Sequence, residues 1–475
     1  MKKVLFILII IALALTVFAC TNKEGENICN ADYDITLSLD NDVIKGQQTV
    51  NISNVYADGL DGVVFNLYAN AYSENTTDKA YSGKLEKYGG ITLSKVTVDN
   101  QQITNYSISQ NGQLLKVPVA AMKLKDKVSI GMEYTVNIPH SNLRLGVVND
   151  SYNLANFYPQ LAVFNDGAFR EDRFTTIGDP MLSEVANYQV TLTVNKDLVV
   201  ASSAKAVTES TKNELKTYMF KGEKIRDFAM AANKNFKTVK ANYDDIAVTY
   251  YYTSDKNSAA TLECAVSAVK TFSEAFGKYE YPVFSIVQTP FFCDGMEFSS
   301  LIYISDTSKD VLNTVIHETA HQWWYGMVGS DSINESYLDE GLTSFVSAYY
   351  YLLNDDIDSY NSMMKETVDS YMLYEKLQKM RKNNNVLVMN KSIYDYTSYQ
   401  YDMLAYNKGS MMFMSLYEVM GKDKFNKSLK TYFENNKYGI ADVKNLCEAF
   451  SKVGKTEYAG FINGWIGDNV IATFA

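Results

Sequence analysis

Two histidines four residues apart, with a glutamate between them, restrict this chain more than any other feature of its sequence. The segment reads His317-Glu318-Thr319-Ala320-His321. The surrounding region, 306–329, is predicted to be a helix, because its apolar residues recur at helical spacing: Val311, Leu312, Val315, Ile316 and Ala320. Residues four apart share one face of a helix. Both imidazoles can therefore reach one metal ion, with Glu318 projecting beside them.

A catalytic zinc site has three protein ligands and one open position, so a third donor must come from elsewhere in the chain. Glu340 is the candidate, because it follows His321 by a spacer of eighteen residues and lies in a predicted helix, 335–353, that a short reversal would return to the first helix. Glu335 and Asp339 compete for this role. Glu335 would face another direction, and Asp339 is better suited to orienting a ligand. The alternative is a histidine pair in ordinary core packing, which is disfavoured because the chain has only 3 His.

The organisation of the chain follows from its length and from a change in hydrophobic period. A chain of 475 residues exceeds the size that one hydrophobic core usually serves, so two or three domains are expected. Between residues 31 and 240, apolar and polar residues alternate as in half-buried strands, and Asn41-Asp42 and Asp58-Gly59 provide turns. The boundary is placed near Ala241, because helical spacing begins after residue 250; two short apolar strands, 283–287 and 301–304, follow, and from Asp306 onward helices dominate. We therefore expect an α+β protein, with an antiparallel β saddle or sandwich domain followed by an α-rich domain.

The first residues are typical of an export signal. Lys2 and Lys3 precede an apolar run that ends at Cys20 and is short for a membrane span, which needs about 20 apolar residues. Val17-Phe18-Ala19-Cys20 resembles a bacterial lipobox. The resemblance implies a signal peptide over 1–19, a lipid on Cys20 and a tether over 20–30. Ordinary secretion or an uncleaved anchor is the alternative, and each version places the protein outside the cytoplasm, on the outer face of a bacterial cell membrane, in the periplasm or in the medium.

Charge and cysteine usage exclude two classes of function. The net charge of -11 argues against a nucleic-acid partner, because phosphate binding needs clustered Lys and Arg. The cysteines other than Cys20 are scattered and show no C-x-x-C spacing, so their disulfide pairing is not assigned: Cys29, Cys264, Cys293 and Cys447. Any metal chemistry must therefore rest on histidine and carboxylate ligands.

The spacing from His321 to Glu340 resembles that of the gluzincin aminopeptidases, the family that includes aminopeptidase N and the leukotriene-hydrolysing aminopeptidase. The segment Cys293-Asp294-Gly295-Met296-Glu297-Phe298 resembles the family's Gly-Ala-Met-Glu-Asn segment. That resemblance implies that Gly295 and Met296 run along the substrate backbone and that Glu297 binds its free α-amino group. A fixed carboxylate at that place favours a substrate with an N-terminal ammonium. The chain departs from the family pattern with Asp for Gly, Gly for Ala and Phe for Asn.

Further segments extend the resemblance over nearly the whole mature chain. Tyr406-Asn407-Lys408-Gly409 resembles the family's Tyr-x-Lys-Gly segment, which implies that Tyr406 donates a hydrogen bond to the oxyanion of the reaction. Tyr158-Pro159 and Gly178-Asp179-Pro180 resemble parts of the family's N-terminal β domain. Gln160, which follows Tyr158-Pro159, is a candidate for that domain's contribution to amine binding.

The resemblance implies a thermolysin-like catalytic domain over 241–475 and a zinc metallo-aminopeptidase that hydrolyses peptides with a free N-terminus. One zinc ion is expected on the two motif histidines and Glu340, with Glu318 as the general base. Two alternatives stay open. A thermolysin-like endopeptidase would share the metal site but would have no use for Glu297. A catalytically inactive surface lipoprotein would bind peptides without cleaving them.

Overall fold

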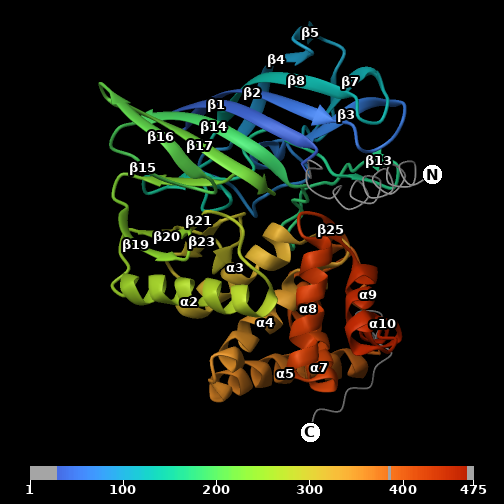
Figure 1. Cartoon of the computed structure of the whole chain (residues 1–475). Coiled ribbons are helices and arrows are strands. Elements are labelled where there is room, and N and C mark those ends of the chain that lie inside the picture. Colours follow the sequence, from blue (N-terminus) through green and yellow to red (C-terminus); the bar gives the residue numbers. More distant parts are fainter. Residues whose placement is uncertain (1–28, 383–386, 468–475) are drawn as a thin grey trace, which may run out of the picture.

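The computed structural model of the protein describes residues 29–382 and 387–467. A β-rich region formed by the first half of the chain lies against a mostly helical region formed by the second half (Figure 1). The predicted α+β organisation, with strands first and helices second, is therefore confirmed. The predicted signal peptide over 1–19, the lipidation site Cys20 and most of the tether over 20–30 lie outside the described residues.

The largest element of the N-terminal region is an eight-stranded sheet with one face on the core. In β1 every second side chain from Ala31 onward is buried, which is the period-two pattern of such a sheet. Asn41 makes the turn to β2 with a φ of 51°, a left-handed conformation that Asn adopts more readily than most residues. In spatial order the strands are β16 (Lys205–Lys212), β17 (Leu215–Ile225), β14 (Ala186–Asn195), β1 (Ala31–Asp40), β2 (Val43–Ser53), β8 (Lys127–Asn137), β4 (Gly90–Val98) and β5 (Gln101–Ile103).

One pair in this sheet departs from the predicted antiparallel arrangement. β1 and β14 run parallel, with Ile35 opposite Val190 and Leu37 opposite Leu192. Because eleven other strands, β3 to β13, lie between β2 and β14 in sequence, the chain can re-enter the sheet in either direction, whereas a tight hairpin permits only the antiparallel one.

Two four-stranded sheets and a two-stranded ribbon complete the N-terminal region. The first sheet has the order β15 (Val199–Ser202), β18 (Met230–Asn233), β10 (Ser151–Leu154) and β9 (Leu145–Val148). The second has the order β11 (Gln160–Leu161), β3 (Leu60–Asn66), β7 (Leu114–Met122) and β6 (Ser107–Ile108), and the ribbon pairs β12 (Phe164–Asn165) with β13 (Ala168–Phe169).

The second region begins with a five-stranded sheet. Its first strand starts at Lys237, so the predicted domain boundary at 240–241 falls inside this strand. The last strand lies at the edge of the sheet, and among the described strands it pairs with one neighbour, β23. The order is β19 (Lys237–Tyr243), β20 (Ile246–Tyr252), β21 (Val283–Thr289), β23 (Leu301–Ser305) and β22 (Gly295–Met296).

Helices form most of the remainder. Two segments have π-helical hydrogen bonding, Gln322–Met327 directly after α3 and Asp402–Lys408 directly before α7. Such segments are frequent at functional sites. The α-helices are α2 (Ser258–Phe276), α3 (Val311–Ala320), α4 (Glu340–Leu353), α5 (Ile357–Met380), α6 (Ser398–Tyr401), α7 (Gly409–Met420), α8 (Lys422–Asn436), α9 (Val443–Gly454) and α10 (Ala459–Ile466). Shorter elements are the 3₁₀ turns Tyr68–Tyr72, Ser336–Leu338 and Ile393–Asp395 and the paired strands β24 (Gly329–Ser330) and β25 (Ile440–Ala441).

Two global properties can be stated for the part of the chain that the structure describes. None of its helices is both long and apolar enough to cross a membrane. Its cysteines, Cys29, Cys264, Cys293 and Cys447, are free thiols.

A buried arginine joins the two regions. Arg226 follows β17, and its guanidinium donates through Nε to the Tyr325 carbonyl at 2.8 Å, and through its terminal nitrogens to the carbonyls of Ser183 at 2.5 Å and Gly439 at 3.0 Å. Ser183 belongs to the N-terminal region, whereas Tyr325 and Gly439 belong to the helical region. A β-carbon at Gly329 would lie 2.5 Å from the guanidinium carbon, so this glycine leaves the space that Arg226 occupies.

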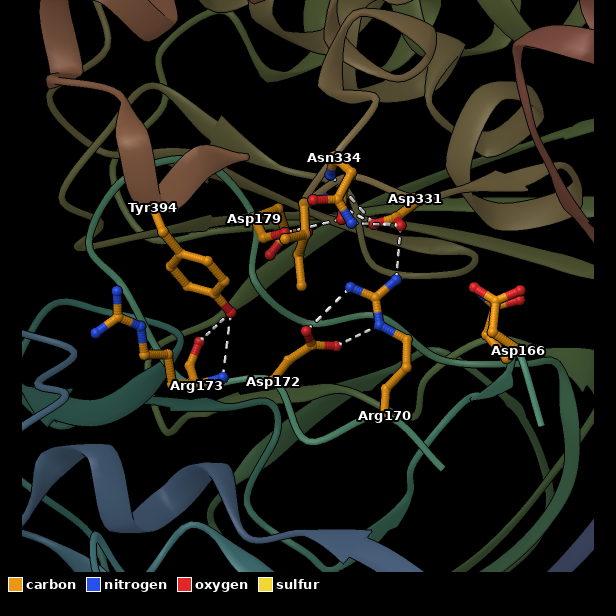
Figure 2. A network of polar contacts seen from close by, with 11 residues as sticks. Asp166, Arg170, Asp172, Arg173, Asp179, Asp331, Asn334 and Tyr394 are labelled. Carbon is orange, nitrogen blue, oxygen red and sulfur yellow. Dashed lines mark hydrogen bonds and ion pairs between the residues drawn. The ribbon is translucent and has the colours of Figure 1, made fainter. Parts of the chain in front are cut away.

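A polar loop after β13 forms a second connection between the regions (Figure 2). Arg170 binds Asp172 through two nitrogens, at 2.7 and 3.0 Å, and Asp331 through a third at 2.6 Å. The Tyr394 hydroxyl donates to the Arg173 carbonyl at 2.8 Å and accepts from the Arg173 amide at 3.1 Å. Both contacts hold the loop of the N-terminal region against the helical region.

We expect Arg226→Met to lower the free energy of unfolding by about 3 kcal/mol, because three buried carbonyls lose a charged donor. Arg381→Met, at an exposed position, is the matched control and is expected to change it by less than about 0.5 kcal/mol. Urea unfolding followed by tryptophan fluorescence measures both. Equal unfolding free energies for the two variants would contradict the role given to Arg226.

Candidate functional site

The two motif histidines lie at the C-terminal end of α3. The Asp310 side chain caps the start of this helix by accepting from the Asn313 amide at 3.2 Å. Val315, Ile316 and Ala320 are buried, whereas Leu312, predicted to belong to the same apolar stripe, is exposed. The helical spacing brings the Nε2 atoms of His317 and His321 to 3.2 Å from each other.

Glu340 meets both histidines from the start of α4. Its Oε2 atom lies 3.5 Å from Nε2 of His317 and 3.3 Å from Nε2 of His321. The predicted continuous helix over 335–353 is wrong at its start, because residues 336–338 form a 3₁₀ turn and α4 begins at Glu340 itself. This break places Glu340 in the first turn of the helix, from which its side chain reaches α3.

Residues of α4 and the turn before it orient the imidazoles. The Nδ1 atom of His321 lies 2.8 Å from the Asp339 carboxylate and 3.2 Å from the Thr343 hydroxyl. The Nδ1 atom of His317 lies 3.3 Å from the Ser347 hydroxyl. An acceptor at Nδ1 favours the tautomer that carries its proton there, which leaves Nε2 free to bind a metal.

These three residues fit a zinc ion. In tetrahedral coordination with bonds of about 2.0–2.2 Å, neighbouring ligand atoms are about 3.3–3.5 Å apart, and the three separations are 3.2, 3.3 and 3.5 Å. The buried Oε2 atom of Glu340 accepts no hydrogen bond from the described residues. Two nitrogens and one carboxylate oxygen that face a common point are a donor set that zinc accepts.

Glu318 lies buried beside this point. Its Oε2 atom has no hydrogen-bond partner in the described part of the chain. Burial raises the pKa of Glu318 to about 8, with Glu340 and Asp339 adding to the rise and His321 opposing it. A β-carbon at Gly295 would lie 2.4 Å from Glu318 Oε1, so the glycine that replaces the family's alanine makes room for this carboxyl group. A carboxyl group with a raised pKa suits proton transfer near neutral pH.

Tyr406 approaches from the π-helical segment before α7. Its hydroxyl donates to Glu340 Oε1 at 2.6 Å, and its ring stacks on His317 with centroids 6.2 Å apart. Burial, together with the charge of Glu340, raises the pKa of Tyr406 well above its usual value, so the phenol keeps its proton and stays a donor. A β-carbon at Gly341 would lie 2.7 Å from the Gly409 α-carbon, so a close contact between two glycines brings this segment to α4.

Glu297 directly follows the edge strand β22. Its carboxylate, the carboxylate of Glu318 and a ring nitrogen of His321 offer atoms that all lie within 4.8 Å of one another. Burial raises the pKa of Glu297 well above its usual value. Gly295 and Met296 pair with Ile304 and Tyr303 of β23, and no strand of residues 29–382 or 387–467 pairs with the other side of β22. A further strand could therefore join that side.

A cavity of about 900 Å³ between the two regions reaches this site. Glu297, Glu340 and Tyr406 line it from the helical region, and Arg144 and Asp179 line it from the N-terminal region. Neither Arg144 nor Asp179 is among the predicted site residues. No sequence motif around Arg144 indicates that it lines a cavity. Asp179 lies in the Gly178-Asp179-Pro180 segment, and the resemblance of that segment to the family could have indicated it.

Gln160 does not line this cavity. It lies buried in β11, where its side-chain oxygen accepts a hydrogen bond from Asn156 at 3.1 Å. The structure therefore brings together His317, Glu318, His321, Glu340, Glu297 and Tyr406 with Gly295 and Met296, and leaves Gln160 apart from them.

Comparison with known proteins agrees with this architecture. The chain is 22% identical over 478 residues to aminopeptidase 2 of Candida albicans. The matched stretch covers 92% of this chain and 47% of that protein. It is 23% identical over 249 residues to the tricorn protease-interacting factor F2 of Thermoplasma acidophilum. This matched stretch covers 49% of this chain and 31% of that protein. The chain thus spans about half the length, or less, of the curated relatives it matches.

Among solved structures, the fold matches the M1 zinc metallopeptidase of Deinococcus radiodurans with a TM-score of 0.66 at 16% identity, over 94% of this chain and 95% of that chain. The family model described as the peptidase family M1 domain matches residues 260–465, the stretch that carries α3, α4 and the Tyr406 segment. This stretch of the chain is therefore similar to a peptidase family M1 domain.

Proposed function

We propose that the protein is a zinc-dependent aminopeptidase that removes N-terminal residues from peptides. The observation that carries the proposal is the convergence of His317, His321 and Glu340 on one point, with two further buried carboxyl groups, Glu318 and Glu297, beside it. The M1 domain and the relatives named as aminopeptidases support it. A Deinococcus M1 structure described as bound to a Tyr-Ser-Ala substrate supports short peptides as the substrate class.

One zinc ion on His317, His321 and Glu340 would supply a Lewis acid for the peptide carbonyl and lower the pKa of water to about 7. Glu318, whose carboxyl group lies buried beside the three candidate ligands, accepts the proton of the attacking water and returns it to the leaving amine. The Tyr406 hydroxyl, which donates to Glu340 in the free protein, turns to the oxyanion that develops on the carbonyl.

Glu297 and β22 decide which peptides are cleaved. The substrate backbone extends along the free edge of Gly295 and Met296, as in other complexes in which a peptide adds a strand to a sheet. Glu297 receives the N-terminal ammonium at the end of that strand. An internal peptide segment offers no charge to this buried carboxylate, so the site favours the first residue of a chain.

We also propose that the protein is held on the outer face of a bacterial membrane by a lipid on Cys20. The lipobox-like Val17-Phe18-Ala19-Cys20 after a short apolar run supports this location. Substrates would then be peptides outside the cytoplasm.

Replacement of Glu340 by glutamine and replacement of Glu318 by glutamine are expected to affect zinc binding differently. Glu340→Gln is expected to lose zinc, because a carboxylate ligand becomes a weakly binding amide. Glu318→Gln is expected to keep about one zinc per chain and to lose hydrolysis by at least ~100-fold, because the base is removed and the ligands remain. Metal analysis after gel filtration, together with an aminoacyl-nitroanilide assay, measures both. Full activity of Glu318→Gln would contradict the mechanism.

Blocking the substrate amine separates an aminopeptidase from an endopeptidase. Acetylation of a short peptide is expected to lower its kcat/KM at least ~100-fold, because the buried Glu297 then faces an uncharged amide. Mass spectrometry of the products identifies the cleaved bond. Equal cleavage of blocked and free peptides would favour the thermolysin-like endopeptidase, and binding of both without cleavage would favour an inactive binding protein.

Replacement of Cys20 tests the location. We expect the wild-type protein to partition with membranes and to be released only by detergent, and Cys20→Ser to lose the labelling by a palmitate analogue that the wild type shows. Cys29→Ser, nine residues further on, is the matched control and should keep the label. Absence of label from the wild-type protein would contradict the proposal.

A further inference from the structure

A buried glutamine joins the metal-binding helix to the segment that carries Glu297. Gln322 directly follows His321 and is the first residue of the π-helical segment after α3. Its side chain is buried, it does not line the catalytic cavity, and it takes no part in the proposed metal binding or proton transfer. Burial of an amide is unfavourable unless its donor and its acceptor both have partners. The partners of this amide therefore indicate its role.

Both ends of the Gln322 amide bind the backbone directly after Glu297. Its Oε1 atom accepts from the Ser300 amide at 2.7 Å, and its Nε2 atom donates to the Phe298 carbonyl at 3.2 Å. The same nitrogen donates to the Glu318 carbonyl of α3 at 3.4 Å. One side chain thus links the residues that follow Glu297 to the helix that carries the two motif histidines.

The segment that Gln322 binds is a turn that its own sequence does not favour. The Phe298 carbonyl accepts from the Leu301 amide at 3.0 Å, which closes a β-turn over residues 298–301 between β22 and β23. Ser300 occupies the third position of this turn with a φ of 53°. Turns with a positive φ at that position usually have glycine or asparagine there, so a serine is strained. The turn therefore depends on outside contacts, of which Gln322 supplies two.

The turn holds the backbone on the C-terminal side of Glu297. Glu297 stands between Met296, the last residue of β22, and Phe298, the first residue of the turn. The side chain of Phe298, which replaces the family's asparagine, is buried and packs edge-to-face on Tyr303 of β23 with ring centroids 5.0 Å apart. Packing on β23 and hydrogen bonding to Gln322 thus fix this backbone from two directions.

The restraint matters because Glu297 lies close to a like charge. Its carboxylate and that of Glu318 offer oxygen atoms within 4.8 Å of each other. Two carboxylates at this separation repel each other when both are ionised. An unrestrained Glu297 segment would therefore shift away from Glu318, and the two hydrogen bonds of Gln322 oppose that shift.

We propose that Gln322 is a positioning residue of the aminopeptidase reaction, whose amide fixes the distance between the candidate zinc ligands and Glu297. This inference rests on the proposed aminopeptidase function. Gln322 directly follows a candidate zinc ligand and Phe298 directly follows Glu297, so their hydrogen bond joins the metal end of the site to its amine end. The distance between these ends decides how well a ligand that binds the metal also reaches Glu297 with its amine.

Two ligands that differ in the amine report on the position of Glu297. Leucine hydroxamate carries an α-amino group and 4-methylpentanohydroxamate lacks it, whereas both offer the same hydroxamate to the metal. Calorimetry on the zinc-loaded protein gives the ratio of their dissociation constants. We expect the wild-type protein to prefer the amine. Gln322→Met removes both hydrogen bonds and should reduce that preference about tenfold, because a displaced Glu297 loses a charge-assisted hydrogen bond to the ammonium.

The zinc content of Gln322→Met and its affinity for the ligand without an amine should stay at the wild-type values, because the metal ligands are unchanged. Gln322→Asn, which withdraws the amide by one methylene group, is a milder second variant and should lose part of the amine preference. If Gln322→Met does not fold, the result for Gln322→Asn decides.

Gln288→Met is the matched control. Gln288 is also a buried glutamine, and its Oε1 atom accepts from the amides of Thr253 and Ser254 at 3.2 and 3.1 Å. Its replacement also removes two hydrogen bonds to the backbone, but neither Gln288 nor its partners line the cavity. We expect both Gln288→Met and Gln322→Met to unfold at a lower temperature than the wild type, and Gln288→Met to keep the full amine preference.

The outcomes distinguish this inference from the function on which it rests. If the wild-type protein binds both ligands equally, the proposed aminopeptidase function fails. If the wild type prefers the amine and the Gln322 variants keep the full preference, or Gln288→Met loses as much, the inference about Gln322 is overturned. Loss of zinc, or an equal loss of affinity for both ligands, would also overturn it, because Gln322 would then act on the metal ligands and not on Glu297.

Discussion

The carboxylate of Glu340 connects the parts on which this site depends. One of its oxygens faces the Nε2 atoms of both histidines, and the other accepts a hydrogen bond from Tyr406. The residue before it, Asp339, lies against the far nitrogen of His321, and the residue after it, Gly341, allows Gly409 to approach. Three consecutive residues at the start of α4 thus provide a candidate ligand, orient another and bring in the Tyr406 segment.

The cavity lies between two regions that polar contacts hold together. The guanidinium of Arg226 satisfies carbonyl groups on both sides, and the loop of Arg170 is held to the helical region at several points (Figure 2). Small shifts of the N-terminal region would move Arg144 and Asp179 relative to Glu297. These contacts therefore hold the two walls of the cavity against each other.

The sequence predicts the order of the regions and the metal motif well, because both depend on local periodicity. Helical spacing places His317 beside His321, and a period of two marks strands such as β1. The parallel pairing of β1 with β14 depends on a long connection with no local signature. The break before Glu340 and the π-helical segment after α3 depend on packing around the site, so the local pattern predicted continuous helices over 306–329 and 335–353.

The same limit applies to the cavity. Glu297 and Tyr406 could be found because each stands in a recognisable segment, whereas Arg144 lines the cavity from the N-terminal region and meets Met296 of the edge strand β22. Gln160 was a reasonable candidate by its neighbours in sequence, but β11 turns it into the core of the N-terminal region. Contacts between regions far apart in sequence are not encoded in local patterns.

The position of the metal tests this account most directly. Anomalous diffraction at the zinc edge from crystals of the purified protein should show one peak, at about 2.0–2.2 Å from Nε2 of His317, Nε2 of His321 and a carboxylate oxygen of Glu340. Glu297, Glu318 and His321 form a second group of residues close enough to hold a metal. A peak located between these three residues would contradict the account. It would place the metal on the residues to which we assign proton transfer and amine binding.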